Sequence, residues 1–368
     1  MSRSVEQLFQ KARISELRDA VPTRMLEDPA ELASTVALCY VCDEQPGFGR
    51  KRCGRGFLYV DTQGKRIADP VLRRRFETLV IPPAWTNVWI CSDENGHIQV
   101  TGRDAQGRKQ YIYHPRWEVL RNQKKFERMV PFGESLPDLR SRLDADLRRR
   151  ELQREKVLAL VIKLLEETLI RVGNIQYTQH NGSYGLTTLC DHHADIDGAS
   201  VHFEFRGKSG VELEVDLCDR RLARLVKQCQ ELPGQRLFQY LDEHGQPQSV
   251  DSSDVNSYLK QITRADITAK DFRTWGGTVT ALRLFHELGP CEQEKQLKRN
   301  VCATIKRVAR TLGNTPSVCR NYYVHPVVID AYSDQTLFRA VRRASRRKPR
   351  NDHDLQVEER ALLHILGD

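Results

Sequence analysis

Apolar and polar residues alternate along several short stretches of the N-terminal third, as they do in strands with one buried face. Arg55–Ile67 alternates around a Gly-containing turn, and Val88–Val100 repeats this pattern, with Pro82-Pro83 between the two. Both stretches predict β-hairpins, and Gln110–Tyr113 extends the β-rich region. Ahead of them, roughly thirty charged and weakly periodic residues are interpreted as a partly helical arm.

From about Trp117 onward the periodicity becomes helical. Leu139–Glu155 is dense in Arg, Asp and Leu, and Val157–Ile170 has the continuous apolar character of a buried helix. We therefore predict a domain boundary near Glu118. The predicted fold class is α+β, with a small β-rich domain over residues 1–118 and a larger, mainly α domain over residues 119–368.

The larger domain contains one further β pattern. Ser200–Arg206 and Val211–Val215 lie on either side of Gly207-Lys208-Ser209-Gly210, which predicts a hairpin with a tight turn. Helical periodicity resumes after Asp219 and breaks from Gly245 to Val250, where Gly and Pro fall close together. No internal repeat is apparent.

Composition favours an intracellular protein with a polyanionic partner. The 368 residues carry a formal net charge of +9, from 58 Lys and Arg against 49 Asp and Glu. The N-terminus lacks the apolar core of a signal peptide and no apolar run approaches a membrane span, so we expect a soluble protein. Ten Cys are scattered without a regular framework, which is typical of reduced thiols.

Four places in the larger domain carry side chains suited to phosphate chemistry. They are Arg171-Val-Gly-Asn174 after the apolar helix, Lys208 at the hairpin tip, Lys270-Asp-Phe-Arg273, and Leu312-Gly-Asn314 through Tyr322-Tyr323. Each alone has a structural explanation, because an Arg can cap a helix, a Lys in a turn is usually a surface residue and a Tyr pair is usually core. Only the combination suggests a site.

Taken together and in this order, these residues resemble the active-site set of the type IB DNA topoisomerases, in particular their compact poxvirus-like and bacterial branch. The resemblance extends from about Pro29 to Tyr332 and includes Gly107-Arg-Lys-Gln-Tyr-Ile-Tyr113 and Phe205-Arg-Gly-Lys-Ser-Gly210. The spacing of Asn314 and Tyr323 also matches the family. The resemblance implies a catalytic domain of the tyrosine recombinase and type IB topoisomerase type.

The resemblance implies roles for two arginines and a tyrosine. Arg171 and Arg273 match the residues that stabilise charge on the scissile phosphate, and guanidinium donors suit its non-bridging oxygens. Tyr323 matches the nucleophile, whereas Tyr322 falls on a non-catalytic position. A phenol, with an ordinary pKa of about 10, is a poor nucleophile at neutral pH unless cations and a close phosphate favour its ionised form.

Two further residues complete the implied active site. Lys208 matches the general acid, which supplies the proton that a departing deoxyribose 5′-oxygen needs. Asn314 stands where poxvirus-like enzymes have His and bacterial relatives have Asn. An amide can donate a hydrogen bond to a phosphate oxygen but is neither acid nor base at neutral pH, so proton transfer through this position is excluded.

In the small domain, Gln110, Tyr111 and Tyr113 match residues that contact the duplex in the family, and Lys109 is a candidate phosphate contact. Alternating side chains on a strand can present one face to a DNA groove. The same alternation leaves open that Tyr113 is a core residue.

Three other signals are set aside. Two groups offer the ligand types of a zinc site: Cys39, Cys42 and Cys53, and Cys190, His192 and His193. Neither group completes a four-ligand set with the usual spacing. The Gly207-Lys208-Ser209 turn lacks the spacing and the following helix of a phosphate-binding loop. The basic run Arg342–Arg350 is either a DNA contact or a solvated helix end.

These features predict an enzyme that relaxes supercoiled duplex DNA by cutting and resealing one strand through a 3′-phosphotyrosyl link. The resemblance implies a clamp around DNA and a reaction without ATP, metal or another cofactor. We expect a monomer in the cytoplasm, associated with the nucleoid and without membrane contact.

Two other functions stay open at this point. A tyrosine recombinase uses the same chemistry, but its usual His-x-x-Arg is Lys270-x-x-Arg273 here, and the β-rich N-terminal domain also favours a topoisomerase. A noncatalytic DNA-binding protein would form no covalent adduct with DNA.

Overall fold

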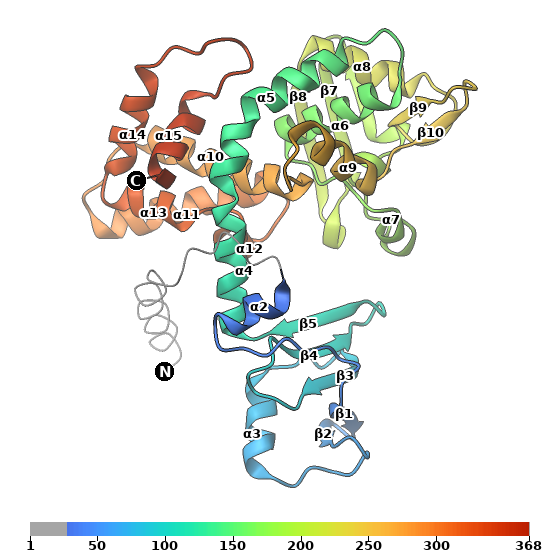
Figure 1. Ribbon diagram of the computed structural model, residues 1–368, viewed down its shortest axis with the longest axis vertical. Coiled ribbons are helices and arrows are strands. Elements are labelled where there is room, and N and C mark those ends of the chain that lie inside the picture. The colour runs from blue at the N-terminus through green and yellow to red at the C-terminus, as the bar shows by residue number, and fades with distance from the viewer. Residues whose placement is uncertain (1–27, 368) are drawn as a thin grey trace. The chain divides into compact units, whose positions relative to one another are not determined.

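The computed structural model describes residues 28–367, so the predicted N-terminal arm lies almost entirely outside the described residues. The chain divides into two compact units, Met1–Lys124 and Lys125–Asp368. The division falls inside helix α4 (Pro115–Glu127), a few residues after the boundary predicted from the sequence. Figure 1 labels most helices and strands of both units.

The first unit is built on a five-stranded antiparallel sheet with the strand order β2-β1-β3-β4-β5. The strands are β1 (Gly47–Cys53), β2 (Gly56–Val60), β3 (Thr86–Cys91), β4 (Ile98–Arg103) and β5 (Lys109–Tyr113). Two helices accompany them, α2 (Pro29–Ser34) and α3 (Pro70–Thr78). Each begins with an Asp whose side chain caps the first turn and a Pro that fits its first position.

One predicted hairpin is confirmed and the other is wrong. Val88–Val100 contains the β3–β4 pair and its connecting turn, as the alternation indicates. In Arg55–Ile67, by contrast, only β2 is a strand, and its partner is the preceding β1 rather than the residues after the turn. The turn at Gly64 does form, but the chain beyond it pairs through a single bridge between Val60 and Arg66.

The first unit buries two small apolar clusters. The larger one lies between α3 and the sheet and consists of Ile67, Phe76, Ile81, Val88, Ile90 and Val100. The second cluster joins α2 to the start of α4 and consists of Ala33, Leu38, Trp117 and Leu120. Tyr113 of β5 packs against this second cluster.

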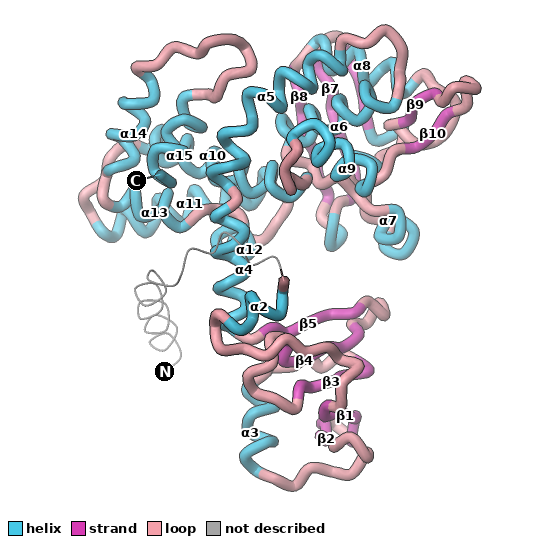
Figure 2. Tube along the Cα trace, in the orientation of Figure 1, coloured by secondary structure: helices cyan, strands magenta, loops and turns pink. Residues whose placement is uncertain are grey.

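The second unit is mainly helical, as predicted, and Figure 2 shows its few strands in magenta among the helices. Its helices are α5 (Met129–Leu147), α6 (Arg154–Thr168), α7 (Ile175–Asn181), α8 (Arg220–Gln230), α9 (Ser252–Thr263), α10 (Ala269–Leu288), α11 (Glu294–Thr311), α12 (Pro316–Tyr322), α13 (Pro326–Ser333), α14 (Thr336–Ser345) and α15 (Val357–Gly367). Its strands are β6 (Ala194–Asp197), β7 (Ser200–Arg206), β8 (Glu212–Cys218), β9 (Gln239–Leu241) and β10 (Pro247–Ser249).

The core of the second unit surrounds α6, the predicted buried helix. Ten of its fifteen residues are buried, and the eight apolar ones join one continuous apolar cluster that extends to α15. The predicted β7–β8 hairpin is confirmed, and β6 adds a third antiparallel strand that the sequence did not reveal. The predicted helical break at Gly245–Val250 belongs to the short β9–β10 hairpin. Leu139–Glu155 is not one helix, because α5 ends at Leu147 and α6 begins at Arg154.

Candidate active site

Arg171 is fixed where the chain leaves the buried helix α6. Leu169 ends that helix in the left-handed conformation (φ 55°), and the backbone carbonyl of Arg171 accepts a hydrogen bond from Leu186 N at 2.8 Å. Its guanidinium donates to Asn314 Oδ1 at 2.7 Å and lies 3.4 Å from Gly313 O. A loop after the apolar helix therefore meets a loop from the far end of the sequence.

Arg273 enters the same region from the first turns of α10 and is only 5% exposed. Its terminal nitrogens donate to the backbone carbonyls of Leu169 and Leu312, the latter at 2.7 Å. Its Nε is buried and has no hydrogen-bond partner among the residues that the structure describes. Burial, followed by the nearby charge of Arg171, lowers the pKa of Arg273 to about 10.

The loop after α11 brings the acceptors for both guanidiniums to one place. Gly313 adopts φ +56°, a left-handed conformation that commonly ends helices and favours glycine. The backbone amides of Gly313 and Asn314 bond back to Arg310 O and Ala309 O, which closes the helix end. The next residues, Thr315 and Pro316, start α12, and the Thr315 side chain caps it.

Tyr323 lies at the end of α12, where its backbone is tied to α10. Tyr323 N donates to Cys319 O at 2.9 Å, and the hydroxyl of Thr278 donates to Tyr323 O at 2.9 Å. Gly277 permits this approach, because a Cβ there would lie 3.4 Å from Tyr323 O and 3.0 Å from a methyl group of Leu312. The Tyr323 ring is 5.5 Å from the Arg273 guanidinium carbon, so helix α10 positions both groups.

Lys125 also contacts Tyr323 and was not identified from the sequence. Its Nζ lies 4.8 Å from the centroid of the Tyr323 ring, and burial lowers its pKa to about 8. The neighbouring Phe126 packs on the His325 ring at 4.6 Å. Nothing in the sequence singles out Lys125 among the basic residues around it, because its role depends on a contact with the distant residue Tyr323.

Lys208 occupies the tip of the β7–β8 hairpin and is exposed. Close to this tip, Leu213 of β8 packs next to the Asn314 loop. A Cβ added to Gly207 would lie 2.7 Å from Leu213, and one added to Gly313 would lie 2.8 Å from it. Four predicted residues, Arg171, Arg273, Asn314 and Tyr323, thus form one cluster, whereas Lys208 makes no hydrogen bond or ion pair with any residue in the described range.

The predicted DNA contacts lie together on β5 in the first unit. Tyr111 is 43% exposed and stacks on Tyr113 with a centroid separation of 5.7 Å. Lys109 pairs with Asp43 at 2.7 Å, and Gln110 donates to Asp104 at 2.9 Å. The pairing with Asp43 raises the pKa of Lys109, which therefore carries its charge at neutral pH.

Neither candidate zinc group gathers into a metal site, since within residues 28–367 no three His, Cys, Asp or Glu side chains are arranged to hold a metal ion. Over the same range, no helix is both long and apolar enough to cross a membrane.

We use the term active-site cations for Arg171, Arg273 and Lys125. Within the described part of the chain, none of the three forms an ion pair with a carboxylate; Arg171 and Arg273 bond instead to backbone carbonyls and the Asn314 amide. Cations held at fixed positions beside a tyrosine, with one buried N–H unused, suit the binding of an oxyanion such as a phosphate. The phenol is then the available nucleophile.

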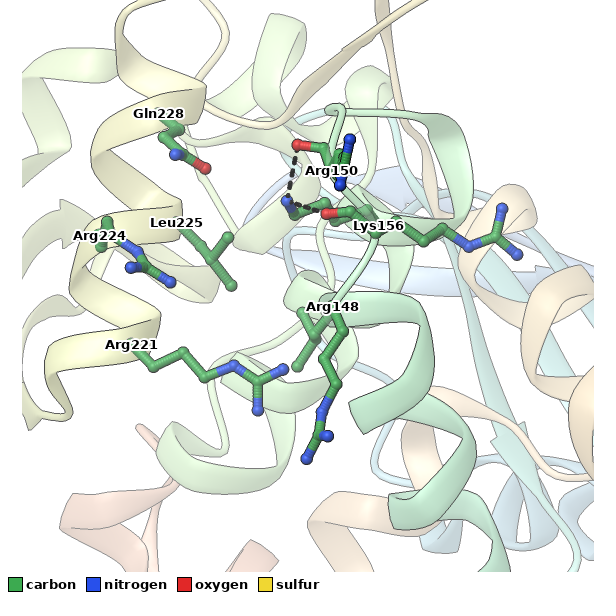
Figure 3. A pocket seen from close by; sticks show the side chains of 9 residues that line it. Arg148, Arg150, Lys156, Arg221, Arg224, Leu225 and Gln228 are labelled. Carbon is green, nitrogen blue, oxygen red and sulfur yellow. Dashed lines mark hydrogen bonds between the residues drawn. The ribbon is translucent and has the colours of Figure 1, made fainter.

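A second group of basic residues lies at the opposite end of α6, and we call Arg148, Arg149, Lys156 and Arg221 the helix-end cations. They line a surface pocket of about 510 Å³ in which α8 faces the residues after α5 (Figure 3). Arg148 pairs with Asp144 at 2.8 Å and Arg149 with Asp146 at 2.8 Å.

The other two helix-end cations also have close acceptors. Arg221 pairs with Asp144 as well, and buried Lys156 donates to the backbone carbonyl of Arg149 at 2.6 Å. Arg148 and Arg149 follow the C-terminal end of α5, where cations are favourable, and the acceptors of all four residues explain this group without a ligand.

Two family models match the chain. A model described as the catalytic core of eukaryotic DNA topoisomerase I matches residues 114–347. A second model, described as the N-terminal domain of bacterial DNA topoisomerase IB, matches residues 56–104. The first match covers the active-site cations, Lys208, Asn314 and Tyr323.

Similar whole proteins carry names that agree with these models. A DNA topoisomerase 1B of Acanthamoeba polyphaga mimivirus is 31% identical over 299 residues, which cover 79% of this chain and 89% of the relative. A DNA topoisomerase 1B of vaccinia virus (strain Copenhagen) is 26% identical over 247 residues, or 65% of this chain and 74% of the relative. A DNA topoisomerase 1 of rabbit fibroma virus is 24% identical over 253 residues.

Proposed function

The chain belongs to the type IB DNA topoisomerases, and we propose that it relaxes supercoiled DNA by reversible cleavage of one strand through Tyr323. The observation that carries the proposal is the cluster around Tyr323. Arg171 and Arg273 lie beside it without carboxylate partners in the described chain, and Nε of Arg273 is buried and unpaired. A scissile phosphate bound here would supply the missing acceptor.

In the proposed cleavage step, the phenolic oxygen of Tyr323 forms a bond to phosphorus while the bond from phosphorus to the 5′-oxygen breaks. The phenolic proton passes to water. Arg171 and Arg273 donate to the non-bridging oxygens, where negative charge increases in the transition state. Asn314 adds a donor, because Arg171 occupies its Oδ1, and its amide nitrogen uses one N–H in a 3.4 Å hydrogen bond to Leu312 O and keeps the other for phosphate.

Lys208 is the proposed general acid, which protonates the departing 5′-oxygen. Its exposed position at a hairpin tip supports this role, because a tip can enter a groove of the bound duplex. The products are a 3′-phosphotyrosyl link and a free 5′-hydroxyl. Rotation of the free end changes the linking number, and the reverse reaction reseals the strand with the energy stored in the link, so neither ATP nor metal is needed.

We propose that the first unit contributes duplex contacts through Lys109, Gln110, Tyr111 and Tyr113. The exposure of Tyr111 on the edge strand β5 and the charge of Lys109 support this role. The enzyme would act as a monomer on DNA in the cytoplasm, associated with the nucleoid.

A plasmid relaxation assay in EDTA without nucleotide tests the proposal. The wild-type chain should relax the plasmid and form protein–DNA adducts that survive denaturation. Tyr323→Phe should still bind duplex DNA, but it should neither relax the plasmid nor form the adduct. Relaxation that requires a divalent metal or ATP would contradict the mechanism. Relaxation of a plasmid without a recombination site separates this activity from that of a recombinase.

A further inference from the structure

The ammonium of Lys125 lies against Tyr323 without the partners that a buried charge usually has. Its Nζ is 4.8 Å from the centroid of the Tyr323 ring and 5.4 Å from that of Phe126. Within residues 28–367 it forms neither a hydrogen bond nor an ion pair. A neutral aromatic ring is only a weak partner for a cation that has lost much of its hydration.

A carboxylate on α10 lies near Lys125 but is engaged elsewhere. Asp271 Oδ2 accepts hydrogen bonds from the backbone N and hydroxyl of Thr268 at 2.8 Å, and it pairs with Arg128 at 3.2 Å. Its charge raises the pKa of Lys125, but burial outweighs it and lowers that pKa to about 8. The better partner for Lys125 would be a negative charge on Tyr323 itself.

We propose that Lys125 is a positioning residue for strand cleavage, whose ammonium holds the Tyr323 ring and favours the ionised form of the phenol during attack. The proposal rests on the proposed function, because it takes Tyr323 as the nucleophile. Lys125 neither gives nor receives a proton in this step. The phenolic proton goes to water, the oxygen–phosphorus bond forms as the bond to the 5′-oxygen breaks, and Lys208 protonates that oxygen.

Other charged or titratable groups surround this pair. They are Asp271 and Arg273 on α10, Cys319 on α12, His325 at the start of α13 and Arg171 after α6. Burial lowers the pKa of His325 to about 4 and raises that of Cys319 to about 11, so both are neutral near pH 7. Arg273, whose pKa is about 10, stays largely charged up to pH 9, so among these groups Lys125 is the cation that titrates between pH 7 and 9.

The proposal gives the effect of Lys125 a defined pH dependence. Because its pKa is about 8, the lysine is charged and effective below pH 8 and loses this effect as the pH rises through that value. Replacement by Met should therefore slow cleavage most at pH 6.5–7.5. At pH 9.5–10 the wild-type lysine is itself neutral, and the two proteins should cleave at similar rates.

The test measures single-turnover formation of the covalent adduct on a duplex oligonucleotide, with saturating full-length enzyme, from pH 6 to 10. Lys125→Met should be roughly 10- to 100-fold slower at pH 7, a range expected for the loss of one nearby charge, and within threefold of wild type at pH 10. Lys125→Arg, which stays charged, should restore the rate at pH 7 to within threefold. Lys227→Met on the exposed face of α8 is the matched control and should behave as wild type.

Two results would overturn the assignment to Lys125. A deficit of equal size at every pH, with Lys125→Arg as slow as Lys125→Met, would indicate a packing role. Weaker duplex affinity with a smaller salt dependence, but a normal rate at saturation, would indicate a phosphate contact instead. Failure of the proposed function is distinguishable, because in that case Tyr323→Phe would still form the adduct.

Discussion

Two groups of basic side chains in the second unit differ in what neutralises them. The helix-end cations face Asp144 and Asp146 and the carbonyls that follow α5. The active-site cations face backbone carbonyls, one amide and a tyrosine ring, with no ion pair to a carboxylate in the described chain. Each group includes a buried cation, Lys156 in the first and Arg273 in the second, and the two groups lie at opposite ends of α6, so burial alone does not separate them.

The two groups differ in whether acidic side chains of the same chain neutralise their positive charge. The helix-end cations are satisfied in the folded chain and stabilise the junction of α5 with α6 and α8. The active-site cations repel one another, and the nearby charge of Arg171 helps to lower the pKa of Arg273. A bound phosphate would relieve that repulsion. Substitutions in the first group should therefore change stability, and substitutions in the second should change the reaction.

The largest expected effect concerns Lys208, which also lacks a carboxylate partner within the described residues. Lys208→Ala should slow cleavage about 10²- to 10⁴-fold on ordinary DNA, the usual range for loss of a general acid. With sulfur in place of the scissile 5′-oxygen the defect should largely disappear, because a thiolate leaves without a proton. Adduct formation in a single turnover measures both rates.

Arg171→Ala and Arg273→Ala are the contrast, since their defects should persist with the sulfur substrate. An equally slow Lys208→Ala reaction on both substrates would mean that Lys208 acts through position or charge, and that another cation supplies the proton.

Arg171→Ala should slow cleavage about 10²- to 10³-fold, because it removes a donor from the developing phosphate charge. Its matched control is Arg148→Ala, which removes a helix-end cation and should leave the rate within twofold. Adduct formation at saturating enzyme compares the two variants with wild type. Equal rates for both variants would remove the functional distinction between the two groups.

The sequence predicted the elements that depend on local patterns and missed those that depend on distant contacts. Alternation predicted β3–β4 and β7–β8, and apolar continuity predicted α6. The pairing of β2 with β1 was missed, because β1 contains Gly and several basic residues rather than alternating apolar ones. The candidate site residues came from a family resemblance, and geometry has added Lys125 to them.

Asp146→Asn should reduce stability rather than catalysis. Burial would raise the pKa of Asp146, but hydrogen bonds from Tyr258 at 2.7 Å and Arg149 at 2.9 Å hold it below its usual value. Loss of these charge-assisted bonds should cost about 1.5–3 kcal/mol of unfolding free energy. Cleavage by the folded fraction should stay within twofold of wild type, and thermal unfolding measures the first effect.

The pH dependence of stability follows from the sign of that shift. A carboxyl whose folded pKa is depressed contributes its full stability above its unfolded pKa of about 4, and the contribution is lost as the pH falls through the folded value. The difference in unfolding free energy between wild type and Asp146→Asn should therefore shrink below pH 4. A constant difference down to pH 2 would contradict the assigned ion pairs.

The smallest effects should come from single surface contacts with phosphate. Duplex affinity should fall with salt by about 0.9 log units per neutralised phosphate for each tenfold rise in concentration. Lys109→Ala should reduce this slope by about one phosphate, whereas Arg148→Ala should leave it unchanged. Binding isotherms at several salt concentrations give the slopes, and a flat dependence for the wild-type chain would contradict a basic DNA interface.

The most direct test of the account is to identify the atom that joins the protein to DNA. The trapped adduct is digested with nuclease and trypsin, and the peptide spanning residues 321–339, which contains both Tyr322 and Tyr323, is sequenced by mass spectrometry. The account predicts a nucleotide linked through its 3′-phosphate to Tyr323. A nucleotide on Tyr322, on another residue or linked through a 5′-phosphate would contradict it.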